Sequence, residues 1–186
     1  MGRRPVAGRE GHDQGDQRQG PGAADGLTPE PRERPTVRLL LFSPAGRLLL
    51  MRFEDEHTSP GGWWCTVGGG VDEGEALEEA ARRELFEETG HTEVELGPVV
   101  WVREHVLTVE GEPRRLVEHY FLATAVHEEV IDHHWTELER RVVKAMRWWS
   151  PDEIAASEAT IFPEGLGELL LDLLRDGPPE SPVRIG

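Results

Sequence analysis

The stretch that decides both the fold and the chemistry runs from Gly69 to His91 and reads GGVDEGEALEEAARRELFEETGH. An α-helix turns by about 100° per residue. At that pitch the carboxylates of Glu84, Glu87 and Glu88 lie within an arc of roughly 100°, so the sequence predicts that they share one face of a helix. A glycine-rich turn stands directly before this helix.

The same helical face continues towards the N-terminus with the small and apolar residues Leu77, Ala80 and Ala81. A stripe of this kind packs inward, so the glutamates extend a face that should be buried. Like charges three or four residues apart repel, by roughly 0.2–0.5 kcal/mol per pair even on an exposed helix. A hard divalent cation with oxygen ligands would offset this repulsion. We therefore interpret the carboxylates as a metal site that faces a phosphate, rather than as a solvated acidic face.

The segment fits the longer pattern G-x5-E-x7-R-E-U-x-E-E-x-G-U, in which U is apolar. Eight of its nine specified positions are filled, by Gly69, Glu75, Arg83, Glu84, Leu85, Glu87, Glu88 and Gly90. The segment therefore resembles the Nudix box. Two residues depart from what is common in that family: His91 replaces the apolar residue after the last glycine, and Val67 replaces a proline before the first. Neither departure removes a ligand or a charge.

The resemblance covers about residues 36–177 and implies an α/β fold, a Nudix-type α/β/α sandwich with a mixed β-sheet. It implies a site for Mg²⁺ or Mn²⁺. The ligands implied are the carboxylates of Glu84, Glu87 and Glu88 and the backbone carbonyl of Gly68.

Four side chains carry the catalysis that the resemblance implies: Glu87, Glu88, Arg83 and Glu139. Arg83 is expected to orient carboxylates through ion pairs, with Glu75 as a partner. The general base in relatives comes from the box or from a later loop, and the candidates on that loop are Glu128, Glu129, Glu137 and Glu139. Glu139 is preferred because its segment leads straight into the strand that contains Arg-Trp-Trp.

Other residues could contact a substrate. Trp63 and Trp64 precede the glycine turn, and one of them could stack on a base. Adjacent residues of a strand face opposite sides, so the other should lie in the core. The arginines considered for phosphate contact are Arg52, Arg103 and Arg115. His133 and His134 have no matching Cys or His spacing for zinc, so we interpret them as polar loop residues.

Composition divides the chain into a disordered N-terminal tail (1–34), a Nudix-like domain (35–178) and a short C-terminal tail (179–186). The first segment has no aromatic residue and little to bury. Its six arginines and six acidic residues cancel, so the net charge of −16 belongs to the rest of the chain. An acidic domain of this kind disfavours nucleic acid in bulk and membrane surfaces as partners. We expect a soluble cytoplasmic protein that acts on a small phosphorylated, nucleotide-type substrate; a homodimer is compatible with the sequence.

Apolar runs and turn signals predict the order of the elements. Strands are expected at 37–42, 47–53, 63–67, 99–109, 114–126 and 142–149, and helices at 75–89, from Ser150 onward, and at 164–175. The first two strands and the fourth and fifth should form hairpins. Strands and helices interleave without a strict βαβ repeat, which favours a mixed sheet.

Three functions remain open at this point. The main hypothesis is a metal-dependent hydrolase of a diphosphate linkage in a nucleoside diphosphate derivative or nucleoside triphosphate. The alternative is a non-catalytic, nucleotide-sensing module with the same fold, although such modules commonly lose box residues. A third is an isomerase of isoprenoid diphosphates, which would need a reactive cysteine. Cys65 is the only cysteine in the chain, and its apolar context favours a core role.

Overall fold

The computed structural model describes residues 31–186 except 56–58, 110, 132–134 and 136. Most of the predicted tail 1–34, and the two loop histidines, therefore lie outside the described residues. The elements are β1 (Arg32–Phe42), β2 (Leu48–Asp55), β3 (Ser59–Thr66), α1 (Leu77–Thr89), β4 (Val94–Val109), β5 (Glu112–Ala125), α2 (Glu137–Val142), β6 (Val143–Trp149), α3 (Pro151–Ala155), β7 (Ile161–Phe162), α4 (Leu166–Asp176) and β8 (Val183–Ile185).

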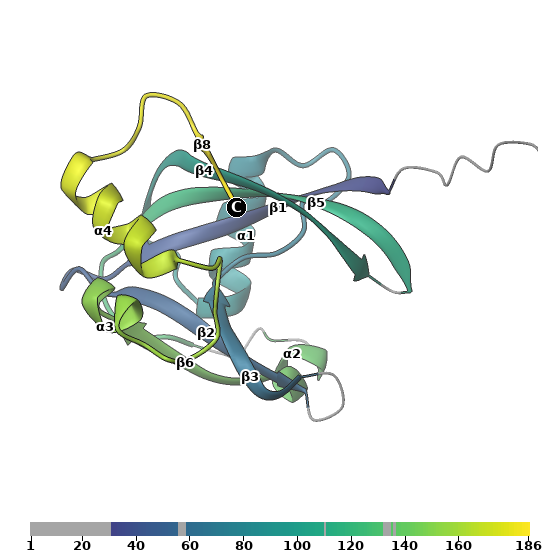
Figure 1. The fold of residues 1–186 in the computed structure, drawn as a ribbon, viewed down its shortest axis with the longest axis horizontal. Coiled ribbons are helices and arrows are strands. Elements are labelled where there is room, and N and C mark those ends of the chain that lie inside the picture. The colour runs from purple at the N-terminus through teal and green to yellow at the C-terminus, as the bar shows by residue number, and fades with distance from the viewer. Residues whose placement is uncertain (1–30, 56–58, 110, 132–134, 136) are drawn as a thin grey trace, which may run out of the picture. The chain divides into compact units, whose positions relative to one another are not determined.

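The strands form one strongly curved mixed sheet (Figure 1) with the order β7-β3-β2-β1-β5-β4-β8, and β6 pairs with β2. β1 runs parallel to β5 along its whole length, whereas β4 and β5 form the predicted antiparallel hairpin. The segment 179–186, which we predicted as a short tail, contains β8, which pairs in parallel with β4.

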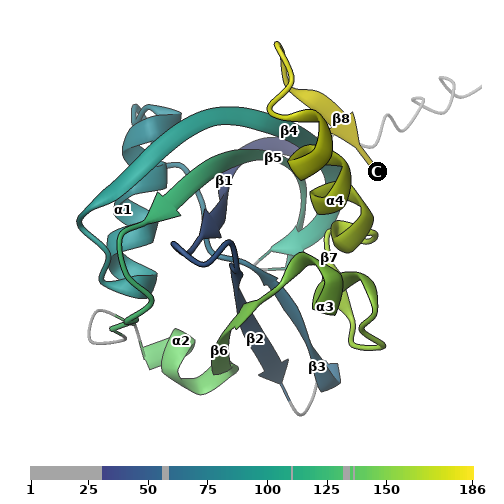
Figure 2. The same ribbon diagram turned by 90° about the vertical axis from the view of Figure 1, so that its left-hand side faces the viewer.

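Each face of the sheet is covered by helices, as Figure 2 shows: α1 lies on one side, and α3 and α4 lie on the other. The alternation of β1 explains the two cores, because Leu39 and Leu41 pack towards α1 while Leu40 packs towards α3 and α4. The predicted α/β/α sandwich with a mixed sheet is confirmed. None of the helices among the described residues is long and apolar enough to cross a membrane.

We predicted that β1 and β2 form a hairpin. The turn between them is present, but the prediction that the two strands pair along their length is wrong. The turn itself is closed by the Ser43 amide, 2.8 Å from the carbonyl of Arg47, but the strands pair only at Phe42 and Leu48. The reason is that β2 already uses both of its edges, one for β3 and one for β6. The two strands therefore diverge, and the chain after β3 takes the free edge of β1.

The start of α3 is as the sequence predicts. Ser150 accepts a hydrogen bond from the amide of Glu153 at 3.1 Å, and the Glu153 carboxylate accepts the Ser150 amide at 2.8 Å. This reciprocal capping box satisfies two amide donors that the first turn of a helix leaves without partners. It ends β6 and turns the chain towards α4.

Candidate active site

The glycine turn is bonded to β1 as a short antiparallel segment. The amide of Val37 donates to the carbonyl of Gly69 at 2.9 Å, and the amide of Leu39 donates to that of Val67 at 2.8 Å. Gly68 has a φ of +135°, and a Cβ there would lie 2.2 Å from the carbonyl oxygen of Val37. Only glycine fits this close approach of two backbones.

Helix α1 presents its glutamates to this turn. Glu84 and Glu88 are 8% and 5% exposed, although carboxylates are seldom buried to this extent without partners. Glu87 lies on the outer side of the same face, with 48% of its side chain exposed. The buried apolar residues of the helix, including Ala80 and Leu85, pull this face against the sheet. The predicted helical arc of glutamates is thus present. The helix that carries it begins at Leu77, two residues later than we expected.

Arg83 joins the helix to the turn. Its guanidinium forms two bonds of 2.9 Å with the Glu75 carboxylate and donates to the carbonyl of Gly70 at 2.9 Å. It also donates to Glu84 at 2.8 Å and to Glu87 at 3.1 Å. The hydrogen bonds from Arg83 and the Asp72 amide lower the pKa of Glu75 to about 2. The predicted partner is therefore the observed one, and the arginine orients two of the proposed ligands.

The turn and the helix also meet through backbone atoms. The amide of Gly68 donates to Oε2 of Glu88 at 2.7 Å. A Cβ on Gly69 would lie 2.5 Å from Oε1 of Glu84, so the missing side chain makes room for that carboxylate. Glu84 and Glu88 thus stand directly against the turn whose carbonyl we predict to be a ligand.

The donor atoms gathered here are all oxygens, which suits Mg²⁺ or Mn²⁺ rather than a softer metal. Among the described residues no three His, Cys, Asp or Glu side chains are placed so that they already enclose an ion. Arg83 bridges Glu84 and Glu87, and the Gly68 carbonyl accepts a hydrogen bond from Arg38 at 3.2 Å. The chemistry of the donors fits the predicted ion.

A cavity of about 400 Å³ opens over these groups. Glu84, Glu88 and residues 68–70 line one side, and Phe53 and Trp63 line another. The two aromatic rings are stacked, with centroids 5.8 Å apart. Trp64 instead packs edge-on against Trp149 in the core next to α4. Of the two adjacent tryptophans, Trp63 is therefore the one that faces this cavity.

A second cavity of about 580 Å³ lies next to the first and shares Arg38, Trp63 and Cys65 with it. Its wall includes Arg103 and Phe162. Of the arginines proposed for phosphate contact, only Arg103 lines either cavity. Arg52 is bound to Glu54 and the carbonyl of Gly61, and Arg115 forms ion pairs with Glu33 and Glu104.

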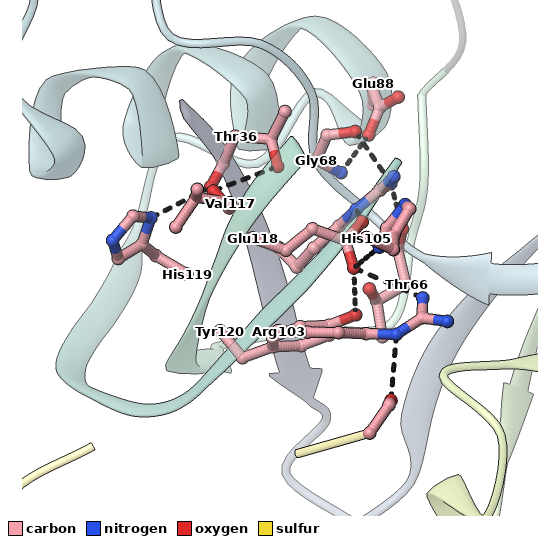
Figure 3. Close-up of polar contacts among 12 residues, drawn as sticks. Thr36, Thr66, Gly68, Glu88, Arg103, His105, Val117, Glu118, His119 and Tyr120 are labelled. Carbon is pink, nitrogen blue, oxygen red and sulfur yellow. Dashed lines mark hydrogen bonds and ion pairs between the residues drawn. The ribbon is translucent and has the colours of Figure 1, made fainter. Parts of the chain in front are cut away.

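A buried carboxylate, Glu118, lies in the wall of the second cavity and was not among our predicted site residues. It accepts hydrogen bonds from Arg38 at 3.0 Å, from the Tyr120 hydroxyl at 2.8 Å and from Arg103 at 3.4 Å. Figure 3 shows Arg103, His105 and Tyr120 gathered around its carboxylate. Burial opposes ionisation, but Arg38 and the Tyr120 hydroxyl keep the pKa of Glu118 below its usual value. A charged residue between the apolar pairs Leu116-Val117 and Tyr120-Phe121 was the signal that could have found it.

The structure places the candidates for the general base in different parts of the fold. Glu128 is paired with Arg47, which closes the turn between β1 and β2. Glu137 and Glu139 belong to α2, but the side chain of Glu139 lies outside the described residues. The loop before α2 does reach the box, because Trp135 donates its indole N–H to the carbonyl of Glu88 at 2.8 Å.

Cys65 lines both cavities but is poorly suited to act as a nucleophile. Burial raises its pKa to about 11, against a partial opposing effect from Arg38. The reactive form of a cysteine is the thiolate, and at neutral pH this residue is a thiol. The isomerase hypothesis therefore loses the activated cysteine that it requires.

His91, the residue that departs from the box pattern, is 2% exposed. Among the described residues neither of its ring nitrogens has a hydrogen-bond partner. Its ring packs 4.6 Å from that of His127 and against Trp148. Burial, together with His127, lowers the pKa of His91.

We expect His91→Leu to raise the free energy of unfolding by about 1 kcal/mol, because a buried polar group without a partner costs about that much or more. The unfolded chain takes up a proton near pH 6.5, whereas the folded one does so only at lower pH. Wild-type stability should therefore fall as pH drops below about 6.5, and the variant should lose less. Urea unfolding at several pH values measures both effects; equal pH dependence in the two proteins would contradict the prediction.

The curved mixed sheet, the acidic helix and the glycine turn together define the class of protein. The model of the NUDIX domain matches residues 32–170, and the chain belongs to the NUDIX family.

Among its curated relatives is an RNA pyrophosphohydrolase of Caulobacter vibrioides, 54% identical over 66 residues, which are 36% of this chain and 37% of that protein. Another is the nucleoside triphosphatase NudI of Escherichia coli, 42% identical over 59 residues, which are 32% of this chain and 41% of that protein. The chain thus matches well under two thirds of the length of either relative.

Solved structures resemble a larger share of this chain than these curated relatives do. A MutT protein from Methanosarcina mazei Go1 has a TM-score of 0.61 at 23% identity, covering 78% of this chain and 96% of that one. The E. coli ORF135 protein has a TM-score of 0.56 at 24% identity, with coverages of 81% and 96%. At these identities the likeness concerns the fold.

Proposed function

We propose that this protein is a divalent-metal-dependent hydrolase of a diphosphate linkage in a nucleoside diphosphate derivative or a nucleoside triphosphate. One observation carries the proposal: two buried glutamates of α1 stand against a glycine turn at the wall of a cavity. The relatives named above, an RNA pyrophosphohydrolase and a nucleoside triphosphatase, support the same reaction class.

In this proposal Glu84, Glu87, Glu88 and the carbonyl of Gly68 hold Mg²⁺ or Mn²⁺. Such an ion, when bound, polarises a phosphoryl oxygen and makes water a better nucleophile. Arg83 keeps the carboxylates on one side of the helix and balances part of their charge. The carboxylates of the box repel a negatively charged phosphate. In this proposal a phosphate therefore binds next to them only when a cation is bound as well.

The proton of the attacking water needs an acceptor, and we assign this role to Glu139 of α2. The assignment is supported by the contact between the preceding loop and the carbonyl of Glu88. Comparing Glu139→Gln with Glu137→Gln tests it. Only the first should lower kcat, and it should do so by about 100-fold or more, within the range for removal of a general base. Equal activity of the two variants would contradict this assignment and indicate that the general base is one of the glutamates of the box.

The second cavity has room for the part of the substrate that carries the diphosphate. It adjoins the first through Trp63, whose ring is available for stacking, and Arg103 supplies donors on its wall.

The test is phosphate and pyrophosphate release from a panel of nucleoside triphosphates, dinucleoside polyphosphates, nucleotide sugars and 5′-triphosphorylated RNA, with Mg²⁺ or Mn²⁺. We expect hydrolysis of at least one class and its complete loss with excess EDTA, because no protein side chain replaces the ion. Restoring Mg²⁺ should restore activity. Tight binding without turnover of any substrate would instead support the non-catalytic module.

A further inference from the structure

Arg38 and Glu118 form an ion pair that the proposed reaction does not use. They lie on the neighbouring strands β1 and β5, and Nε of Arg38 is 3.0 Å from Oε1 of Glu118. The Glu118 side chain is 3% exposed. Removing two charges from water is costly, and well-packed apolar residues often serve stability as well or better. Stability alone is therefore a poor reason for this pair.

The other end of the Arg38 guanidinium reaches the glycine turn. Its Nη1 lies 3.2 Å from the carbonyl oxygen of Gly68 and 3.5 Å from that of Thr66. The amide of Gly68 is held by Glu88 from the opposite side, at 2.7 Å. One glycine thus has its N–H fixed by the box helix and its C=O fixed by a strand.

Glu118 is itself held in one position. The Tyr120 hydroxyl donates to its Oε2 at 2.8 Å, and Arg103 donates to the same atom at 3.4 Å. Figure 3 shows that these partners approach the carboxylate from a side away from Gly68. With Glu118 fixed, the planar guanidinium of Arg38 has a defined orientation, because its donors form a rigid fork.

We propose that Arg38, anchored by Glu118, is a positioning residue that orients the Gly68 carbonyl oxygen towards the metal ion. This rests on the proposed function, which makes that oxygen a ligand. A carbonyl oxygen has two lone pairs, so it accepts a hydrogen bond from Arg38 and still has one for a cation. Glu118 also offsets the positive charge of Arg38, which would otherwise repel a nearby cation.

The test is Mn²⁺ binding to the full chain without nucleotide, measured from the electron paramagnetic resonance signal of free Mn²⁺. We expect Arg38→Gln and Glu118→Gln each to raise the Kd for Mn²⁺ by about 10-fold or more, as loss of outer partners of metal ligands does. The double variant should bind no more weakly than Arg38→Gln, because Glu118 acts through Arg38. If the losses of Mn²⁺ affinity in the two single variants add in the double variant, Glu118 does not act through Arg38 and the inference is overturned.

Tyr120→Phe keeps both charges and removes one hydrogen bond to Glu118, so it remains informative if the other variants fail to fold. Its Kd should rise by less than about tenfold, in keeping with the net contribution of one hydrogen bond. Unchanged binding in every folded variant would overturn the inference.

The matched control is Glu104→Gln, which breaks ion pairs with Arg115, 3.4 Å long, and with Arg184. Glu104 lies on β4, which β5 separates from β1 and the glycine turn. The Kd of this variant should equal that of the wild type. If the wild type itself binds no Mn²⁺, the proposed function fails. If the wild type binds and Arg38→Gln binds equally well, only the positioning role fails.

Discussion

Replacing Glu88 with glutamine is expected to lower kcat by at least about 100-fold in saturating Mg²⁺, and Glu87→Gln should have an effect of similar size. A metal-bound transition state gains several kcal/mol from the ion, and each 1.36 kcal/mol corresponds to about tenfold in rate. The glutamine oxygen can still accept the Gly68 amide that Glu88 accepts at 2.7 Å, so the fold should survive. The loss is then one of ligand charge.

Rates of phosphate release over a range of Mg²⁺ concentrations measure this effect. Glu78→Gln is the control, because Glu78 lies on the same helix but in its first turn and is exposed. Its rate should stay within about twofold of the wild type, as surface substitutions usually have small effects. Full metal-dependent activity of both Glu87→Gln and Glu88→Gln would rule out the proposed site.

The second large effect is expected from a single methyl group, in Gly69→Ala. The new Cβ would lie 2.5–2.8 Å from the carboxylate atoms of Glu84, which Arg83 holds in place. Gly69 does not have a positive φ, so alanine suits its backbone and the strain falls on the carboxylate. Overpacking of this kind costs typically 1–3 kcal/mol. If the displacement reaches the ligand, kcat should fall by about tenfold to 100-fold.

Gly70→Ala is the matched control at the next position. The Cβ there would meet the flexible end of Arg34 at 3.0 Å, which can move aside. We expect near wild-type Mn²⁺ affinity and rate for Gly70→Ala, and weaker Mn²⁺ binding for Gly69→Ala together with a melting temperature lower by a few degrees. Equal behaviour of the two variants would show that Glu84 does not depend on the space beside Gly69.

Local patterns in the sequence predicted much of this structure. The helical arc of the glutamates and the cap at Ser150 follow from contacts within a few residues, and such contacts are encoded in spacing. The partner of Arg83, eight residues away, was implied by the family resemblance. The curved sheet between helices was predictable from the order of elements and from the family resemblance.

The remainder depends on contacts between residues that are distant in the sequence. The sequence alone could not show that β2 would use both edges and so release β1, because strand pairing is decided by the whole sheet. The choice between Trp63 and Trp64 depends on the same pairing. The pair of Arg38 and Glu118 is separated by 80 positions, and only the parallel alignment of β1 and β5 brings its members together.

Because β1 diverges from β2, the proposed metal site and the walls of the second cavity are built from different parts of the chain. The proposed metal ligands all come from one continuous segment, Gly68 to Glu88, whereas the walls of the second cavity come from strands scattered between Arg38 and Phe162. Substitutions in those walls can therefore change what is recognised while the reactive segment stays intact. Arg38 lines both cavities, so we expect substitutions to be least tolerated there.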